Sequence, residues 1–238
     1  MINKPSLLST VSLPESIIKN VIEAGLEIDC IPFIDIHYLS LPFTLADIIE
    51  YVTKKTPFVF TSANAVKAVS GYLNHNNDFN IYCIGQNTLN TVTQYCNEKC
   101  VKGCADNAEK LADIIIENNE KDIVFFCGDK RMDTLPQKLQ SAGIDVEEIK
   151  VYETIETPTK LTKNYTGILF FSPSGVNSYF SINTILPETL LFAIGNTTAK
   201  AIEKRTTNKV IVCKTASKMD LINEAIKFLN LSKYTIYE

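Results

Sequence analysis

The sequence predicts an α/β protein made of two domains, each with a parallel sheet covered by helices on both faces. Short apolar runs typical of buried strands alternate with helical segments of about 10 to 15 residues along the chain. Residues 58–69, FVFTSANAVKAV, are also repeated in modified form by residues 168–180, ILFFSPSGVNSYF. The 238 residues suffice for two cores of ordinary domain size.

The repeat covers two pairs of segments with different spacings. Ser172 follows Ser62 by 110 residues, and Gly195 of IGNTT follows Gly85 of IGQNT by the same 110. A second pair, which starts at Leu7 and Phe125, is offset by 118 residues. We call the segments that start at Leu7 and Phe125 A and A′, and those that start at Phe58 and Ile168 B and B′. The order along the chain is therefore A, B, A′, B′, which indicates an internal duplication. The residues alone leave open whether A shares a domain with B or with B′.

The elements of the N-terminal half follow from apolar periodicity. We expect a strand from Leu7, then a helix with Ile17, Ile18, Val21 and Ile22 on one face, ended by Gly25. The predicted elements that follow are a strand at 27–36, a helix at 45–52, the strand-to-helix unit at 58–69, a strand at 81–85 and a helix at about 88–96.

The second half continues the alternation. Its predicted elements are helix 106–118, strand 122–128, helix 135–143, strand 146–154, the unit at 168–180, strand 190–195 with its helix, strand 209–214 and helix 218–229. Segments 34–42 and 151–158, each flanked by proline, are the predicted crossings between domains.

Composition narrows the class of protein. Apolar residues at 45% and charged residues at 21% are globular values. The formal charge of −4 and the lack of a Lys/Arg block argue against nucleic acid as a partner. Since no run approaches the roughly 20 apolar residues that span a bilayer, we expect a soluble cytoplasmic protein without membrane association. Four of the seven cysteines lie in or beside predicted strands, so we expect reduced thiols.

Hydroxyl residues mark the points where predicted strands give way to helices. Ser172 can cap a helix whose first position Pro173 suits, and the amides of Ser174 and Gly175 then point outward. Any one such turn is more often an ordinary cap. Four turns in duplicated register instead favour an anion site built from helix N-termini. The other residues at these turns are Thr61, Ser62, Ala63, Asn87, Thr88, Thr197 and Thr198.

Other chemistries lack their motifs. The chain has no GxxxxGK[ST], GxGxxG or GxSxG sequence, which argues against a P-loop, a dinucleotide fingerprint and a serine hydrolase. His37 and His75, the two histidines, suit surface or linker roles. Cys96, Cys100 and Cys104 recur every fourth residue and could lie along one helix face, but no fourth ligand has fitting spacing, so we expect no metal.

Two further residues are candidates for chemistry. Tyr152 lies in KVYET, at the predicted crossing where the chain leaves the middle region. It is either a packed strand tyrosine or a functional phenol. Arg131 in CGDKR, the turn that also contains Gly128, could bind a carboxylate or be a solvated loop charge.

The motifs FTSANAV, IGQNT, CGDKR, KVYET, FFSPSGV and AIGNTTAKAIE, in this order and spacing, resemble the uroporphyrinogen-III synthase family. The resemblance covers residues 55–205 well. It implies two flavodoxin-like α/β domains with parallel sheets, pseudo-duplicated, joined by a two-stranded linker, with A paired with B′. The implied boundaries are 1–34 plus 159–238 for the first domain, 42–150 for the second, and 35–41 and 151–158 for the linker strands.

The resemblance also implies an activity and a site in a cleft between mobile domains. The family's reaction converts hydroxymethylbilane, a linear tetrapyrrole with eight carboxylates, to uroporphyrinogen III with loss of the hydroxyl and inversion of the last ring. It implies no cofactor or metal, a monomer, and Tyr152 as the acid for the departing hydroxyl. The hydroxyl and amide groups of the repeated turns, with Gly128 and Arg131, would then bind the substrate's carboxylates.

One departure from the family concerns charge: Leu190 and Leu191 stand where a basic residue can occur. Two rival functions remain. A non-catalytic two-domain protein could bind or sense an anionic metabolite, and turnover would distinguish it. A phosphoacceptor domain would need acids at the strand ends, where this chain has mainly Ser, Thr, Cys and Gly.

Overall fold

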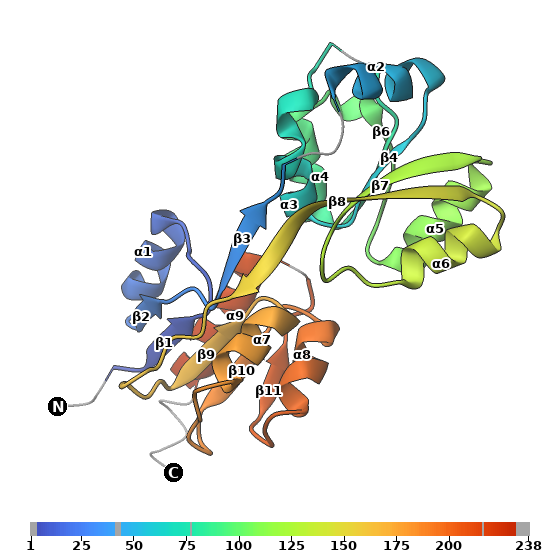
Figure 1. The fold of residues 1–238 in the computed structure, drawn as a ribbon. Coiled ribbons are helices and arrows are strands. Elements are labelled where there is room, and N and C mark those ends of the chain that lie inside the picture. The colour runs from blue at the N-terminus through green and yellow to red at the C-terminus, as the bar shows by residue number, and fades with distance from the viewer. Residues whose placement is uncertain (1–3, 41–43, 77, 216, 232–238) are drawn as a thin grey trace. The chain divides into compact units, whose positions relative to one another are not determined.

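The computed structural model describes residues 4–40, 44–76, 78–215 and 217–231 (Figure 1). The chain divides into two compact units, Met1–Asp35 with Ile155–Glu238, and Ile36–Thr154. Both units consist of a sheet with helices on its two faces, so the predicted α/β class is confirmed.

The first unit contains a five-stranded sheet in the order β11-β10-β9-β1-β2. Its strands are β1 (Ser6–Ser9), β2 (Glu27–Cys30), β9 (Gly167–Phe170), β10 (Leu190–Ala193) and β11 (Val210–Val212). All four pairings are parallel, and β1 pairs with β9 from Leu7↔Gly167 to Ser9↔Leu169. Segment A therefore shares a sheet with B′, the arrangement that the resemblance implies.

Four helices cover the two faces of this sheet. They are α1 (Glu15–Glu23), α7 (Pro173–Phe180), α8 (Asn196–Glu203) and α9 (Lys218–Leu231). Neighbouring residues of β1 point to opposite faces: Leu7 packs in the cluster with α1 and α9, and Leu8 in the cluster with α7 and α8. Ile22 is 58% exposed, so it was wrongly placed on the buried face of α1.

The second unit contains most of a six-stranded sheet in the order β3-β8-β7-β4-β5-β6. The strands are β3 (Ile34–Tyr38), β4 (Phe58–Phe60), β5 (Ile81–Ile84), β6 (Val101–Ala105), β7 (Asp122–Gly128) and β8 (Asp145–Glu156). Apart from β3, this order repeats that of the first unit, with β7 and β8 in the places of β1 and β2. The corresponding strands of the two units have the same order in space but a different order along the chain. This difference explains the two repeat spacings.

The helices of the second unit again form two layers. They are α2 (Leu45–Lys54), α3 (Ala63–Ala68), α4 (Gln86–Tyr95), α5 (Ala108–Glu117) and α6 (Thr134–Ser141), with 3₁₀ turns at Ser70–Tyr72 and Glu98–Cys100. One core contains residues of α2, α3 and α4 with Phe58, Phe60 and Phe126. The other contains residues of α5 and α6 with Val59 and Phe125.

Two sequence predictions are corrected here. The strand expected at 27–36 is two strands, β2 and β3, because Pro32 between them has no N–H to donate to a sheet. Cys96, Cys100 and Cys104, which could have lain along one helix face, do not share a helix: Cys96 ends α4, Cys100 lies in a 3₁₀ turn and Cys104 lies in β6. Strand β6 was not predicted from the sequence because Lys102 and Gly103 interrupt its apolar run.

The division between the two units lies after Asp35 and after Thr154, at positions within β3 and β8. Residues 41 and 42, where the expected linker ends and the expected second domain begins, lie outside the described residues. Which residues act as the linker stays a prediction.

No helix in the described part of the chain is long and apolar enough to cross a membrane.

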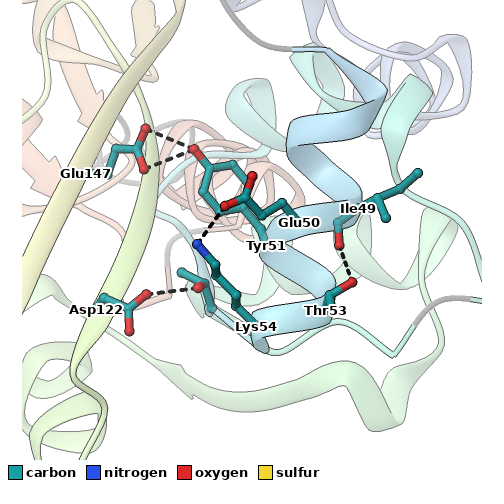
Figure 2. Close-up of polar contacts among 8 residues, drawn as sticks. Ile49, Glu50, Tyr51, Thr53, Lys54, Asp122 and Glu147 are labelled. Carbon is teal, nitrogen blue, oxygen red and sulfur yellow. Dashed lines mark hydrogen bonds and ion pairs between the residues drawn. The ribbon is translucent and has the colours of Figure 1, made fainter.

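Polar contacts fix helix α2 to the amino ends of β7 and β8 (Figure 2). The Tyr51 hydroxyl lies 2.9 and 3.0 Å from the two carboxylate oxygens of Glu147 in β8. Beyond the helix, the Thr56 hydroxyl donates to Asp122 at the start of β7, at 2.8 Å. Burial and the Glu147 carboxylate raise the pKa of Tyr51 to about 12.

We expect the stability of the protein to fall between about pH 10 and 12, because the folded state holds the Tyr51 proton that an unfolded tyrosine loses near pH 10. Tyr51→Phe should lessen this fall when urea unfolding is followed across that range. Glu147→Gln, which removes the charge but keeps the shape, should lessen it in part. An unchanged pH dependence in Tyr51→Phe would contradict the assigned contact.

Candidate functional site

Two predicted serine caps lie at the carboxyl ends of central strands. Ser62 follows β4, and its Oγ accepts from the Asn64 N–H at 3.1 Å to cap α3. Ser172 follows β9, and its Oγ accepts from the Gly175 N–H at 3.1 Å, with Pro173 in the first turn of α7. Both serines therefore cap helices as expected, in corresponding places of the two units.

The other two repeated turns begin without a side-chain cap. Helices α4 and α8 follow Gly85 and Gly195, which have no side-chain oxygen to offer the N–H groups of the first turn. Such N–H groups are suited to a ligand anion. Helix α4 starts at Gln86, slightly earlier than the predicted start at about residue 88, and α8 starts at Asn196.

The polar residues of these two turns divide into exposed and buried members. Asn87 and Thr197 are exposed, whereas Thr88 and Thr198 are 4% and 3% exposed. The identical pattern in both units shows that the duplication extends to side-chain burial. It leaves the exposed pair as the residues whose side chains can meet a ligand, and the buried pair as residues whose backbone amides can do so.

Tyr152 packs directly on Gly128 in the second unit. A Cβ atom built at Gly128 would lie 2.4 Å from Cζ and 2.8 Å from Oη of Tyr152. The β7–β8 register shifts at this point, from Cys127↔Lys150 to Gly128↔Tyr152, so Val151 is the extra residue of an irregularity. The absence of a side chain at Gly128 is what lets the Tyr152 ring lie over the end of β7.

Asp129, which sequence reasoning missed as a site residue, binds strand β8 at Tyr152 and at Thr154. Its N–H donates to the Tyr152 carbonyl at 3.2 Å, and its Oδ1 accepts from the Thr154 N–H at 2.8 Å. The signal for it was present, because a polar residue directly after a buried parallel strand lies where ligands gather in such sheets. Asp129 is therefore a positioning residue for Tyr152.

The surroundings of Tyr152 keep its phenol protonated. Burial raises its pKa, a hydrogen bond with Ser62 lowers it, and the nearby Asp129 charge raises it, with a net increase. An ordinary tyrosine already ionises only near pH 10, so the Tyr152 hydroxyl is neutral at physiological pH. The contact with Ser62 also places Tyr152 beside the capped start of α3.

Arg131 is close to this tyrosine in sequence but already has acidic partners. Its guanidinium forms ion pairs with Glu148 in β8 and with Asp133 at the start of α6, and its side chain is 27% exposed. These carboxylates raise its pKa further. Two carboxylates of the protein therefore compensate its charge, which weakens the case for Arg131 as a substrate ligand.

The first unit has a matching polar edge where β1 and β9 end. Thr10 directly follows β1, and its hydroxyl donates to the Leu169 carbonyl at 2.8 Å. A Cβ atom at Gly175 would lie 3.4 Å from Ser172 Oγ and 3.7 Å from Thr10 Oγ1, so the three residues adjoin. Sequence reasoning missed Thr10, because only the β1–β9 pairing brings it to Ser172.

A positive charge also lies near this edge. The ammonium of Lys218, the first residue of α9, lies 5.8 Å from the ring centre of Phe171, which precedes Ser172. Lys218 thus supplies a positive charge near the end of β9. The sequence did not indicate this charge, since Leu190 and Leu191 stand where a basic residue can occur in the family.

The remaining predicted residues of these turns are half-buried or buried. Thr61 and Ser174 are half-buried, and Ala63 and Gly175 are buried. In the part of the chain that the structure describes, no group of three or more His, Cys, Asp or Glu residues is placed to hold a metal ion.

Comparisons with known proteins agree with one another. The family model described as "Uroporphyrinogen-III synthase HemD" matches residues 15–223. The curated uroporphyrinogen-III synthase of Saccharomyces cerevisiae is 30% identical over 153 residues, 52% of this chain and 54% of the yeast protein. The match thus spans about half the length of that relative.

Solved structures share the fold over nearly the whole chain. A uroporphyrinogen-III synthetase from Helicobacter pylori has a TM-score of 0.64 at 17% identity and covers 94% of this chain and 99% of its own. A mutant uroporphyrinogen III synthase from Thermus thermophilus has a TM-score of 0.62 at 12% identity, with 96% and 99% covered. At such identities the likeness shows the two-domain α/β fold.

We expect Gly128→Ala to cost about 1–3 kcal/mol of unfolding free energy, because the new methyl group overlaps the Tyr152 ring. Gly71→Ala is the matched control, since a Cβ there meets nothing within 4 Å. Urea unfolding measures both. In a Tyr152→Ala background the cost of Gly128→Ala should shrink, and an equal cost in both backgrounds would contradict the packing.

Proposed function

Because this chain belongs to the uroporphyrinogen-III synthase family, we propose that it converts hydroxymethylbilane to uroporphyrinogen III, with inversion of the last ring and loss of one water molecule. The observation that carries this proposal is the placement of Tyr152. A phenol held protonated by burial lies on Gly128, beside a capped helix start, at the carboxyl end of a parallel sheet. The reaction is a cyclising elimination of water in haem biosynthesis, and it makes the protein a lyase.

The substrate's charge suits the two polar edges. Hydroxymethylbilane has eight carboxylates, whereas the protein has a net charge of −4, so local groups rather than overall charge must attract the substrate. Helix N-termini supply such groups through N–H donors and the positive end of the helix dipole. Helices α4 and α8, whose glycine caps leave first-turn N–H groups without a side-chain acceptor from the cap, are the strongest candidates.

We assign carboxylate binding to the repeated turns of each unit. Those of the second unit are Thr61, Ser62, Ala63, Asn87, Thr88 and Gly128, and those of the first are Ser172, Pro173, Ser174, Gly175, Thr197 and Thr198. Backbone amides supply most of the donors at these turns, and the hydroxyls of exposed or half-buried residues supply the rest. Arg131 takes a smaller share, because Glu148 and Asp133 already pair with it.

Tyr152 is assigned the role of general acid. Its phenolic proton transfers to the departing hydroxyl of the substrate, which leaves as water and creates an electron-poor carbon. The hindered carbon of the last ring attacks first, and the spiro intermediate then opens and closes the macrocycle. A proton lost from a ring carbon restores the phenol, since a phenolate whose pKa is raised is a competent base.

Positioning contributes beside proton transfer. Spontaneous closure of hydroxymethylbilane gives the type I isomer, so the enzyme must hold the chain with the hindered carbon near the reacting one. No cofactor or metal is needed for these steps. We further propose that the protein works in the cytoplasm as a monomer, without a nucleic-acid partner, in keeping with its acidic composition.

A non-catalytic binding protein is the alternative, and turnover separates the two. Purified protein is given fresh hydroxymethylbilane, the products are oxidised, and the porphyrin isomers are resolved by chromatography. Predominant type III isomer supports the synthase. Type I isomer alone, from protein shown to be folded, would overturn it and favour a binding role.

We expect Tyr152→Phe to lower the rate of type III formation by about 10²- to 10⁴-fold, the usual contribution of a general acid. Folding should persist because the ring and its packing on Gly128 remain. Tyr51→Phe, which removes a hydroxyl from the same unit at the Glu147 contact, is the matched control and should retain its rate. Full activity in Tyr152→Phe would remove the acid role.

A further inference from the structure

Two cysteines lie side by side on neighbouring strands of the second unit. Strands β5 and β6 are parallel, and their register pairs Cys83 with Cys104. The preceding pair, Tyr82 and Gly103, belongs to the face packed by α5, since a Cβ at Gly103 would meet Ile114. Alternation along each strand therefore puts Cys83 and Cys104 together on the opposite face.

The spacing of this pair lies within the range that a disulfide spans. Neighbouring strands lie about 4.8 Å apart, within the range of roughly 4.4–6.8 Å between Cα atoms that a disulfide spans. The Cys104 thiol also lies within hydrogen-bond reach of the Cys83 thiol. A sulfur–sulfur bond could thus form with little movement of the backbone.

The two thiols differ in their access to solvent. Cys83 is 0% exposed and packs in the core with α3 and α4, whereas Cys104 is exposed on β6 at the edge of the sheet. A small oxidant can reach Cys104 but not Cys83. An exposed thiol beside a buried partner is the arrangement expected of a peroxide-reactive cysteine with a resolving cysteine.

We propose that Cys83 and Cys104 are a reversible redox site that a peroxide oxidises to a disulfide. The Cys104 sulfur attacks the peroxide O–O bond and becomes a sulfenic acid, with release of one water when the oxidant is hydrogen peroxide. The Cys83 sulfur then attacks the Cys104 sulfur and displaces its hydroxyl, which leaves as a second water with the Cys83 proton. Two thiols lose two electrons, and the peroxide is reduced by two electrons.

A second cysteine pair in the same unit provides an internal comparison. Cys96 and Cys100 lie near each other but are both 1% exposed, so neither sulfur is open to an oxidant. Burial raises the pKa of the Cys96 thiol to about 12, as it does for the Cys83 thiol, so thiol pKa does not separate the two pairs. Accessibility, rather than the mere closeness of two sulfurs, therefore selects Cys83 with Cys104.

The cysteine pair lies next to the turn before α4, one of the turns to which carboxylate binding is assigned. Immediately after the cysteine pair, the Gly85 N–H donates to the Ala105 carbonyl at 2.9 Å, and α4 starts one residue later. A disulfide would close the chain between residues 83 and 104, which includes all of α4. This location makes oxidation a modification of the sheet edge that supports the α4 N-terminus.

The test treats the full chain with excess hydrogen peroxide, alkylates free thiols under denaturing conditions and maps the peptides by mass spectrometry. We expect the seven free thiols to fall to five, with a Cys83–Cys104 linked peptide that dithiothreitol reverses. Cys104→Ser should lose the link, and Cys100→Ser, the matched control, should keep it. Cys83→Ala, a small apolar replacement, should instead trap Cys104 as a sulfenic acid that dimedone labels.

Three results would overturn the proposal. They are seven free thiols after peroxide treatment, a link between any other two cysteines in place of this one, and oxidation of Cys104 past the sulfenic acid in the wild type without a link. Because the readout is a covalent bond in a peptide, it is independent of catalytic activity. Failure here and failure of the synthase assay are thus distinguishable.

Discussion

The packing of the Tyr152 ring on Gly128 is the contact on which the proposed chemistry depends. It requires a residue without a side chain at the end of β7, and a Cβ atom there would overlap the ring and its hydroxyl. Asp129 reinforces the arrangement because its backbone and carboxylate both bind β8 beside Tyr152. The same packing fixes the position of the phenol and removes it from water. Loss of contact with water raises its pKa, so the phenol keeps its proton.

The shared spatial plan of the two units explains why polar turns gather where they do. Each unit has five parallel strands in the same spatial order, although they follow one another in a different order along the chain. In such sheets the crevice outside the carboxyl ends of the strands is the usual ligand site. The duplication therefore produced two edges of the same construction, with Ser62 and Gly85 in one and Ser172 and Gly195 in the other.

Local signals in the sequence predicted most of the fold and part of the site. Ser62 and Ser172 were recognisable because a hydroxyl between an apolar strand and a helix is a cap whatever the tertiary structure. Residues whose role arises from distant contacts were not recognisable. Thr10 reaches Ser172 only through the β1–β9 pairing, and the carboxylates that engage Arg131 come partly from another strand. Strand β6 was missed for a local reason, because Lys102 and Gly103 interrupt its apolar run, and the pairing of Cys104 with Cys83 was therefore not expected.

The central claim is that Tyr152 retains its proton and can donate it, and its titration tests this directly. In protein labelled with ¹³C at the tyrosine Cζ atoms, the Tyr152 resonance is the one that is lost in Tyr152→Phe. The account predicts that this resonance titrates with a pKa above the ordinary value of about 10, so it stays in the position of a protonated phenol through neutral pH. Titration at or below the ordinary value would contradict the account, because burial against Gly128 would then not be holding the proton.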